Sequence, residues 1–272
     1  MNATGRAAAS VGFVGLGNMG AALAAGLVRS GRLSPDALFG FDPSASVAPE
    51  FAGVRCQSLS EVAAKSELLV LAVKPHLIGG VCADLAQMDR RPAIVVSIAA
   101  GVPLDAIASA LGDKMRVVRS MPNLAATLGF SATALYAKPS DAGALETAAW
   151  LFEAVGSVVT LARESDMHAF TAVAGSGPAF ACLFAEALAD AGVHEGLTRD
   201  TARVAAAAML RGAAELLLVP GAVPGAVKDA VSSPGGTTIA GIAALEAGGF
   251  RGAVMSAVLA TAQRSRSLAG GS

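Results

Sequence analysis

A run of hydroxyl and glycine residues, SSPGGTT at 232–238, stands between alanine-rich stretches near the C-terminus. Apolar residues recur at helical spacing after it (Ile239, Ile242 and Leu245), so the run marks the N-terminus of a helix. The first backbone amides of a helix have no partner within the helix and attract anions. With the serine and threonine hydroxyls beside them, these amides predict a pocket for a small anion, most simply a carboxylate.

A second chemical motif is the glycine-rich stretch GLGNMG, which contains Gly15, Gly17 and Gly20. It follows an apolar stretch typical of a buried strand and precedes a helix expected from about Asn18 to Arg29. In that context the three glycines allow a tight turn, a close approach of the backbone to a pyrophosphate, and close packing of helix on strand. The motif predicts a dinucleotide site, and a glycine-rich turn without a ligand is the alternative.

The residue that discriminates between nicotinamide cofactors is expected at the end of the second strand, where Asp42 stands. An acidic side chain there accepts a hydrogen bond from the ribose 2′-hydroxyl and repels a 2′-phosphate. Ser44 and its neighbours offer hydroxyls to a phosphate instead, although no basic residue follows before Arg55. The pattern slightly favours NADH and leaves NADPH open, and a turn or helix-cap role for Asp42 is the alternative.

Further candidate residues follow the ends of three more predicted strands, in the segments AVKP, SIAAG and RSMPN. Ligands of open parallel sheets bind outside the carboxyl ends of the strands, so these segments are expected to border one cleft. Pro75 and Pro122 suit an exit from strand to loop, because proline keeps the residue before it out of the helical region. The cofactor contacts predicted from the glycine-rich loop and these segments are Gly15, Leu16, Gly17, Asn18, Met19, Gly20, Ala72, Val73, Lys74, Pro75, Ala99, Ala100, Gly101, Met121, Pro122 and Asn123.

The elements that must position these residues divide the chain into two parts. In the first part, apolar stretches typical of strands buried on both faces alternate with helical stretches. The strands are predicted at 11–16, 37–41, 67–73, 93–99, 115–120, 132–137 and 157–162. The expected fold is α/β, with a Rossmann-type, doubly wound parallel sheet over 11–163 after a flexible lead-in at 1–10.

The second part, 164–272, has no strand pattern and is predicted to be all helical. Helices are expected at 164–173, 177–193, 198–218 and 236–247, with a last one from residue 250. The apolar surface of this part exceeds what so thin a bundle can bury alone. We therefore expect a dimerisation domain, in a homodimer or a larger homo-oligomer. A monomer whose helices fold back on the sheet is the alternative.

Composition argues against several classes of function. The net charge of −1 and the lack of a basic cluster argue against nucleic-acid binding. Hydrophobic residues make up 54% of the chain, but alanine accounts for the excess and no long charge-free apolar stretch occurs, so no membrane span is expected. The three histidines and three cysteines share no short spacing, which predicts neither a metal site nor a disulfide framework and suits the cytoplasm.

Together these motifs resemble those of the pyrroline-5-carboxylate reductase family, which catalyses the last step of proline biosynthesis. The segments that carry the resemblance are FVGLGNMG, LAVKP, SIAAG, RSMPN, AGSGPAF and SSPGGTTIAGIAALEAGGFR, in the family's order and over nearly the whole chain. The resemblance implies a Rossmann domain that binds NADPH or NADH. It also implies a helical domain that interlocks with that of a second copy, giving dimers and often larger rings, with a decamer as one option.

The resemblance also assigns roles within the 232–238 loop. It implies that Thr238 contacts the ring nitrogen of the substrate, which makes this threonine the leading catalytic candidate. A threonine that merely caps its own helix is the alternative. The residues expected to hold the substrate, a small molecule, are Thr238 together with Ser233, Gly235, Gly236 and Thr237.

The chain departs from the family pattern at two positions that bear on the cofactor. Family members commonly have an asparagine that contacts the cofactor after the third strand, and Ser58 is the nearest match here. Many relatives have Ser, Asn or Arg where this chain has Asp42. Ser58 is therefore a further candidate cofactor contact, and both departures concern the choice of cofactor rather than the reaction.

The implied reaction transfers hydride from nicotinamide C4 to the imine carbon of Δ1-pyrroline-5-carboxylate and yields L-proline. A cyclic imine is basic enough to be substantially protonated near neutral pH, so positioning and one hydrogen-bond partner at nitrogen can suffice. β-Hydroxyacid dehydrogenases of the 6-phosphogluconate dehydrogenase kind use a lysine on the interdomain helix, and the matching stretch VAGSGPAFACLF has none. An enzyme that reduces a related cyclic imine and a non-enzymatic dinucleotide sensor are also compatible with this fold.

Overall fold

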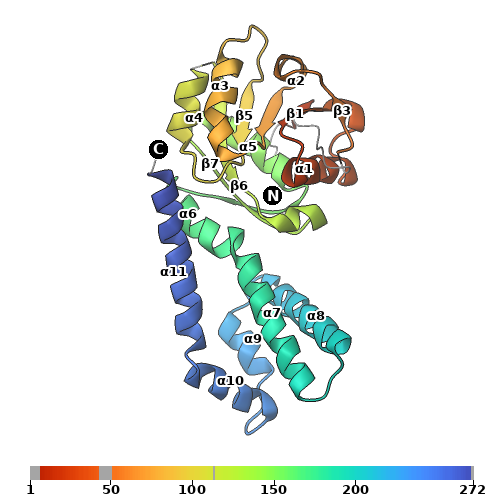
Figure 1. The fold of residues 1–272 in the computed structure, drawn as a ribbon, viewed down its shortest axis with the longest axis vertical. Helices are drawn as coiled ribbons and strands as arrows, with labels where there is room; N and C mark the ends of the chain where they lie inside the picture. The colour runs from red at the N-terminus through yellow and green to blue at the C-terminus, as the bar shows by residue number, and fades with distance from the viewer. Residues whose placement is uncertain (1–6, 43–50, 113, 271–272) are drawn as a thin grey trace. The chain divides into compact units, whose positions relative to one another are not determined.

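The computed structural model describes residues 7–42, 51–112 and 114–270. Of these, residues 7–175 and 261–270 form one compact unit, and Ser176–Ala260 form a second (Figure 1). The sequence pattern predicts a division at 163/164 instead. The structural division lies later because Met167 and Ala172 are buried, and because the end of the last helix belongs to the same unit as the sheet.

The first unit is built on a single sheet, whose order among the described residues is β3-β2-β1-β4-β5-β6-β7-β8. Its strands are β1 (Val11–Val14), β2 (Leu38–Phe41), β3 (Val54–Arg55), β4 (Leu68–Leu71), β5 (Ile94–Ser97), β6 (Arg116–Met121), β7 (Ser131–Ala137) and β8 (Gly156–Thr160). Strands β1 to β6 run parallel, in the order of the doubly wound dinucleotide-binding fold. The chain order reverses between β1 and β4, which is where such sheets bind ligands.

Strand β7 departs from the predicted all-parallel sheet, because it runs antiparallel to β6. The connection between the two strands, 122–130, contains the 3-10 helix η3 (Leu124–Leu128). Parallel neighbours need a crossover of about a dozen residues or more, so this connection is too short for one. Helix α5 (Ala142–Phe152) provides such a crossover from β7 to β8, and these two strands are parallel.

Helices cover both faces of the sheet (Figure 1). Leu23 and Leu27 of α1 (Asn18–Arg29) pack with Phe152 of α5 against one face. The other face is covered by α2 (Leu59–Lys65), α3 (Ile78–Ala86) and α4 (Leu104–Leu111). The strands are therefore buried on both sides, which explains their nearly continuous apolar sequences.

All regular elements of the second unit are helices. It contains α7 (Gly177–His194), α8 (Arg199–Leu218), α9 (Pro224–Ala230), α10 (Thr237–Ala247) and the first half of α11 (Phe250–Ala269). Helix α9 was not predicted from the sequence. Upstream of α7, α6 (Asp166–Phe170) and the π-helix Thr171–Gly175 belong to the sheet unit.

Several large apolar side chains of the helical unit are exposed to solvent in the single chain. Leu183, Val204 and Leu218 are each more than half exposed, as are Met255 and Leu259. Large apolar side chains exposed in this number are typical of a surface that packs against another molecule. Burial within one chain therefore does not explain the composition of these helices.

Within the described residues, one helix, Asp166–His194, has the length and mean hydropathy of a membrane span. The pair formed by α10 and α11, which is bent by 53°, has them only if the two helices are counted as one broken span. Only 11% of the most apolar window of Asp166–His194 is buried in the structure. One or two such helices are weak evidence for a membrane, because a helix that packs against a second copy has the same composition. The absence of a membrane span stays a prediction.

Candidate functional site

The three glycines of GLGNMG have different structural reasons to be glycine. Gly15 has a φ of +99°, and a Cβ there would lie 2.6 Å from the carbonyl oxygen of Ala72. A Cβ on Gly20 would collide with the carbonyl oxygen of Gly15. Gly17 is exposed, and among the described residues no atom beyond its chain neighbours lies within 4 Å of the position of its Cβ. The fold thus requires Gly15 and Gly20, whereas Gly17 leaves open backbone at the N-terminus of α1, where a pyrophosphate can approach.

Asp42 lies beside this loop and helps to hold it. Its carboxylate accepts a hydrogen bond from the backbone N–H of Leu16 at 2.7 Å. The N–H of Gly15 donates to the carbonyl of Phe41 at 2.9 Å. Asp42 therefore fixes the glycine-rich loop, a role that the spacing of the residues did not predict. Ser44, the neighbouring candidate, lies outside the described residues.

The other predicted cofactor segments lie at the same edge of the sheet as the glycine-rich loop. The N–H of Ala72 donates to the carbonyl of Val14 at 2.7 Å, and that of Ile98 donates to the carbonyl of Leu71 at 3.2 Å. Ser97 and Arg119 are register partners on β5 and β6. Because these parallel strands end side by side, the structure brings together the loops containing the predicted residues Ala72, Val73, Lys74, Pro75, Ala99, Ala100, Gly101, Met121, Pro122 and Asn123.

Like Asp42, two further predicted cofactor contacts have partners for their side chains within the protein. The amide of Asn123 accepts from the N–H of Ala125 at 3.1 Å and donates to the carbonyl of Ala174 at 2.9 Å. The hydroxyl of Ser58 accepts from the N–H of Glu61 at 3.1 Å and caps α2. Asn123 thus joins the loop after β6 to the π-helix, and Ser58 caps the start of a helix, as serine commonly does.

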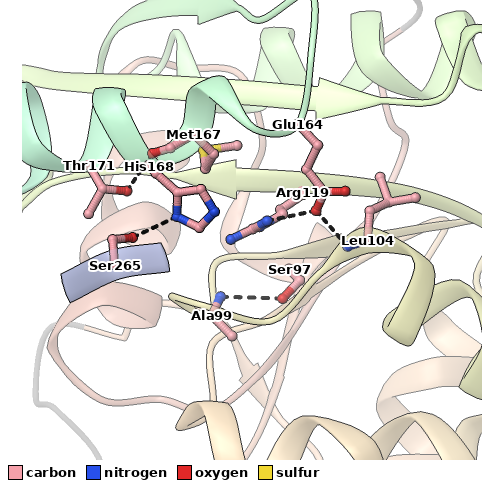
Figure 2. A network of polar contacts seen from close by, with 9 residues as sticks. All are labelled: Ser97, Ala99, Leu104, Arg119, Glu164, Met167, His168, Thr171 and Ser265. Carbon is pink, nitrogen blue, oxygen red and sulfur yellow. Dashed lines mark hydrogen bonds and ion pairs between the residues drawn. The ribbon is translucent and has the colours of Figure 1, made fainter. Parts of the chain in front are cut away.

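A polar network that was not predicted from the sequence lies beside these strand ends (Figure 2). Nη1 of Arg119, whose side chain is 5% exposed, lies 2.6 Å from Oε1 of Glu164. The same oxygen accepts a hydrogen bond from the backbone N–H of Leu104 at 2.7 Å. The sequence does hold one signal for such an ion pair, namely an arginine within an apolar strand. A charge buried there requires a partner of opposite charge. The identity of that partner depends on the fold.

His168 lies next to this pair and contacts the last helix (Figure 2). Its Nδ1 and the hydroxyl of Ser265 on α11 share a hydrogen bond of 2.9 Å. Burial lowers the pKa of His168, and the cations of Arg119 and Arg266 lower it further, against the opposing effect of Glu164. The imidazole is therefore neutral near pH 7, and this contact joins α6 and α11 without a charge on the ring.

The hydroxyl-rich loop 232–238 lies in the helical unit, where it begins α10. Gly236 is the N-cap and offers no side chain to the first amides of the helix. Gly235 has a φ of +65°, and the N–H of Gly236 donates to the carbonyl of Ser233 at 3.1 Å. Thr237 and Thr238 are the first two helical residues, and both are exposed. Thr238 is thus not the cap of its own helix, and its side chain stands at a helix start that favours an anion.

A metal site has no support in the part of the chain that is described. Residues 7–42, 51–112 and 114–270 contain no group of three or more His, Cys, Asp or Glu side chains that could hold a metal ion.

Comparison with known proteins covers both parts of the chain. Residues 164–268 match the family model for pyrroline-5-carboxylate reductase dimerisation, and residues 10–101 match that for NADP oxidoreductase coenzyme F420-dependent. The pyrroline-5-carboxylate reductase of Methanosarcina acetivorans is 40% identical over 266 residues, which cover 95% of this chain and 97% of that relative.

Solved structures give the same result. A pyrroline-5-carboxylate reductase from Coxiella burnetii is similar with a TM-score of 0.87 and 31% identity, and the match covers 96% of this chain and 98% of that one. The pyrroline carboxylate reductase of Plasmodium falciparum, solved with NADP bound, has a TM-score of 0.84 at 29% identity, over 96% of this chain and 98% of that one.

Proposed function

Since the chain belongs to the pyrroline-5-carboxylate reductase family, we propose that it reduces Δ1-pyrroline-5-carboxylate to L-proline with a reduced nicotinamide cofactor. The observation that carries this proposal is the 40% identity to such a reductase over 95% of the chain. The family's glycine-rich loop and hydroxyl-rich helix start are both present in the sequence.

The residues around the glycine-rich loop fit a dinucleotide. Gly17 leaves its backbone open, the first amides of α1 have no side-chain cap, and the loops after β4, β5 and β6 border the same edge. A helix N-terminus attracts phosphate through its amides and its dipole. When bound, the nicotinamide cofactor supplies the hydride. The residues proposed to hold it are those predicted from the sequence at this edge of the sheet.

We assign substrate binding to the N-terminus of α10. The amides around Gly235, Gly236 and Thr237, with the hydroxyl of Ser233, would hold the carboxylate of the substrate. The hydroxyl of Thr238 would bond the ring nitrogen and hold its proton there. This arrangement needs no strong general acid, since the imine is basic enough to carry its own proton.

The assembly we propose is a homodimer formed through the helical unit, with a decamer as a larger option. Two observations support it: the match of 164–268 to a dimerisation family and the exposed apolar side chains of α7, α8 and α11. We also propose a cytoplasmic location, since the three cysteines are unpaired, as expected in a reducing compartment.

The rival assignment to the β-hydroxyacid dehydrogenases lacks its key residue. The stretch 173–184, which includes part of the π-helix and the start of α7, contains no lysine. Without that amine, the chain has no proton relay at the position where those enzymes carry one.

Oxidation of NADH or NADPH with racemic Δ1-pyrroline-5-carboxylate tests the proposed function. The reaction is followed by the loss of absorbance of the reduced nicotinamide. We expect turnover with at least one of the two cofactors. A purified, folded protein that oxidises neither would contradict the enzyme assignment and favour a dinucleotide sensor.

The choice of cofactor is tested at Asp42. Replacement by serine is expected to lower the ratio of kcat/KM for NADH to that for NADPH by about tenfold, equivalent to ~1.4 kcal/mol. The physical reason is the loss of the ribose acceptor and of the repulsion toward a 2′-phosphate. Steady-state kinetics with both cofactors measure this ratio.

Asp42→Asn is the matched variant for that experiment. Asparagine keeps an acceptor for the N–H of Leu16 but removes the negative charge. The variant therefore distinguishes the role of Asp42 in holding the loop from its repulsion of a 2′-phosphate. We expect the asparagine variant to favour NADPH as well. An unchanged ratio in both variants would show that Asp42 only fixes the loop.

A further inference from the structure

Helix α4 begins without a cap of its own. Pro103 occupies the N-cap position and supplies no side-chain hydrogen bond. The N–H of Leu104, a donor of the first turn that has no partner within the helix, is bonded instead by the carboxylate of Glu164 at 2.7 Å (Figure 2). A negative charge at the positive end of a helix is stabilising, so Glu164 caps α4 from a distant part of the sequence.

Arg119 holds this carboxylate in place. The two charged groups are 2.6 Å apart, and their side chains are 5% and 26% exposed. A hydrogen bond between charged groups with this degree of shielding is short and strong. Arg119 lies on β6 directly beside Ser97, the last residue of β5. One oxygen of Glu164 therefore bonds both Arg119 in the second half of β6 and the start of α4.

The segment between these anchors is the loop 98–103, which contains Ala99, Ala100 and Gly101. At its first end, the carbonyl of Ser97 accepts from the hydroxyl of Ser120 at 3.0 Å, and the hydroxyl of Ser97 accepts from the N–H of Ala99 at 3.3 Å. Just beyond its other end, Leu104 is bonded to Glu164. The buried side chain of Leu104 and the bond from its N–H to Glu164 thus fix the C-terminal end of the loop together.

The last helix contacts the same region. A Cβ on Gly101 would lie 3.9 Å from Cβ of Leu268 on α11. His168, one turn after Glu164, shares a hydrogen bond with Ser265 of α11. Residues 164–168 therefore join the loop 98–103 to the end of α11 within the sheet unit.

We propose that Glu164 is a positioning residue for the nicotinamide cofactor: held by Arg119, it caps α4 and fixes the loop 98–103 in its cofactor-binding conformation. This inference rests on the proposed function only in that this loop contacts NADH or NADPH. In this inference Glu164 acts on the cofactor through the loop 98–103.

The test is Glu164→Gln in the full-length protein, with the affinity for NADH and NADPH measured by titration of their fluorescence. Glutamine keeps the shape of the side chain but loses the charge that bonds Arg119 and Leu104 together. We expect Kd to rise about tenfold, as for the loss of a hydrogen bond to a charged group. We also expect faster hydrogen exchange at the amides of 98–104, and a higher KM for the cofactor with little change in kcat at saturation.

Strand β6 offers a matched control, because it carries a second ion pair at its N-terminal end. Nη1 of Arg116, the first residue of the strand, lies 2.9 Å from the carboxylate of Asp141. Asp141→Asn makes the same change of charge on the same sheet but leaves the loop 98–103 untouched. We expect wild-type cofactor affinity in this variant, and equal weakening in both variants would contradict the proposal.

A second variant, Arg119→Met with Glu164→Met, guards against a failure of Glu164→Gln to fold. Replacing both charges leaves neither one buried without a partner, so the fold is expected to survive. The loop still loses its cap, and the same weakening is expected. Wild-type affinity in this double variant or in folded Glu164→Gln would overturn the inference. A wild-type protein that binds neither cofactor would contradict the proposed function itself.

Discussion

Replacement of Thr238 by alanine is expected to lower kcat by more than about tenfold, a loss of more than ~1.4 kcal/mol in transition-state stabilisation. Thr238 is the second residue of α10, and its side chain is exposed beside a helix start whose N-cap, Gly236, has no side chain. Because it does not cap α10, its removal takes little from the fold. The effect should therefore appear in turnover rather than in stability.

The physical reason lies at the ring nitrogen of the substrate. During hydride transfer the charge on that nitrogen changes, and a hydroxyl placed beside it keeps the ring oriented and its proton in place. Misorientation of a reacting group is costly, since well-oriented reactants avoid a large entropic barrier. Loss of the hydroxyl should lower kcat and kcat/KM together, because the contact matters most in the transition state.

Two further variants at this position separate chemistry from packing. Thr238→Ser keeps the hydroxyl and should retain most of the activity. Thr238→Val keeps the shape, loses the hydroxyl, and should behave like the alanine variant. Near-normal turnover in the valine variant, with an unchanged melting temperature, would remove Thr238 from the mechanism.

The second large effect is expected at Gly17. Substitution by valine should raise Kd for the reduced cofactor by more than about tenfold, because a side chain would keep the pyrophosphate from the backbone. The fold should tolerate the change, since no described residue beyond its chain neighbours lies within 4 Å of the added Cβ and φ is −70°. The expected loss of stability is about 1 kcal/mol or less, as for a weaker N-cap. Fluorescence titration and thermal unfolding measure the two effects separately.

Gly143→Val is the matched control for that experiment. Gly143 is also exposed near the start of a helix, α5, with open space around its Cβ position. Helix α5 follows β7, whose antiparallel direction places its carboxyl end at the opposite edge of the sheet from the glycine-rich loop. The control should bind cofactor normally. Normal binding by Gly17→Val would contradict the proposed dinucleotide site, whereas Gly15→Val is expected to disrupt the fold because φ is +99° there.

Much of the fold follows from local patterns in the sequence. Strands such as Leu68–Leu71 are buried on both faces, and their continuous apolar sequence identifies them without any knowledge of their neighbours. Strand direction is not encoded in that pattern, which is why β7 was expected to be parallel. The connection 122–130 is too short for a crossover between parallel strands, and its length therefore indicates the antiparallel direction. Helix α9 was missed because it has only seven residues and none of them is buried. Its sequence therefore shows no helical periodicity of apolar residues.

In the candidate site, too, local motifs could be predicted from the sequence and contacts between distant residues could not. The roles of Gly15 and Gly20 follow from a motif whose context is local. The pairing of Arg119 with Glu164 does not, since it joins residues 45 positions apart. Ser58 and Asn123 stay predicted cofactor contacts, and their side chains also bond nearby backbone N–H groups, as serine and asparagine readily do. Spacing in the sequence does not reveal these second bonds.

The reduction itself is tested most directly by following the transferred hydrogen. The protein is incubated with Δ1-pyrroline-5-carboxylate and NADH or NADPH that carries deuterium at both C4 positions, and the product is examined by mass spectrometry and NMR. We expect L-proline with one deuterium on the ring carbon that was the imine carbon, in equal amount to the cofactor oxidised. Unlabelled proline, or no proline from folded protein with either cofactor, would contradict the proposed reduction.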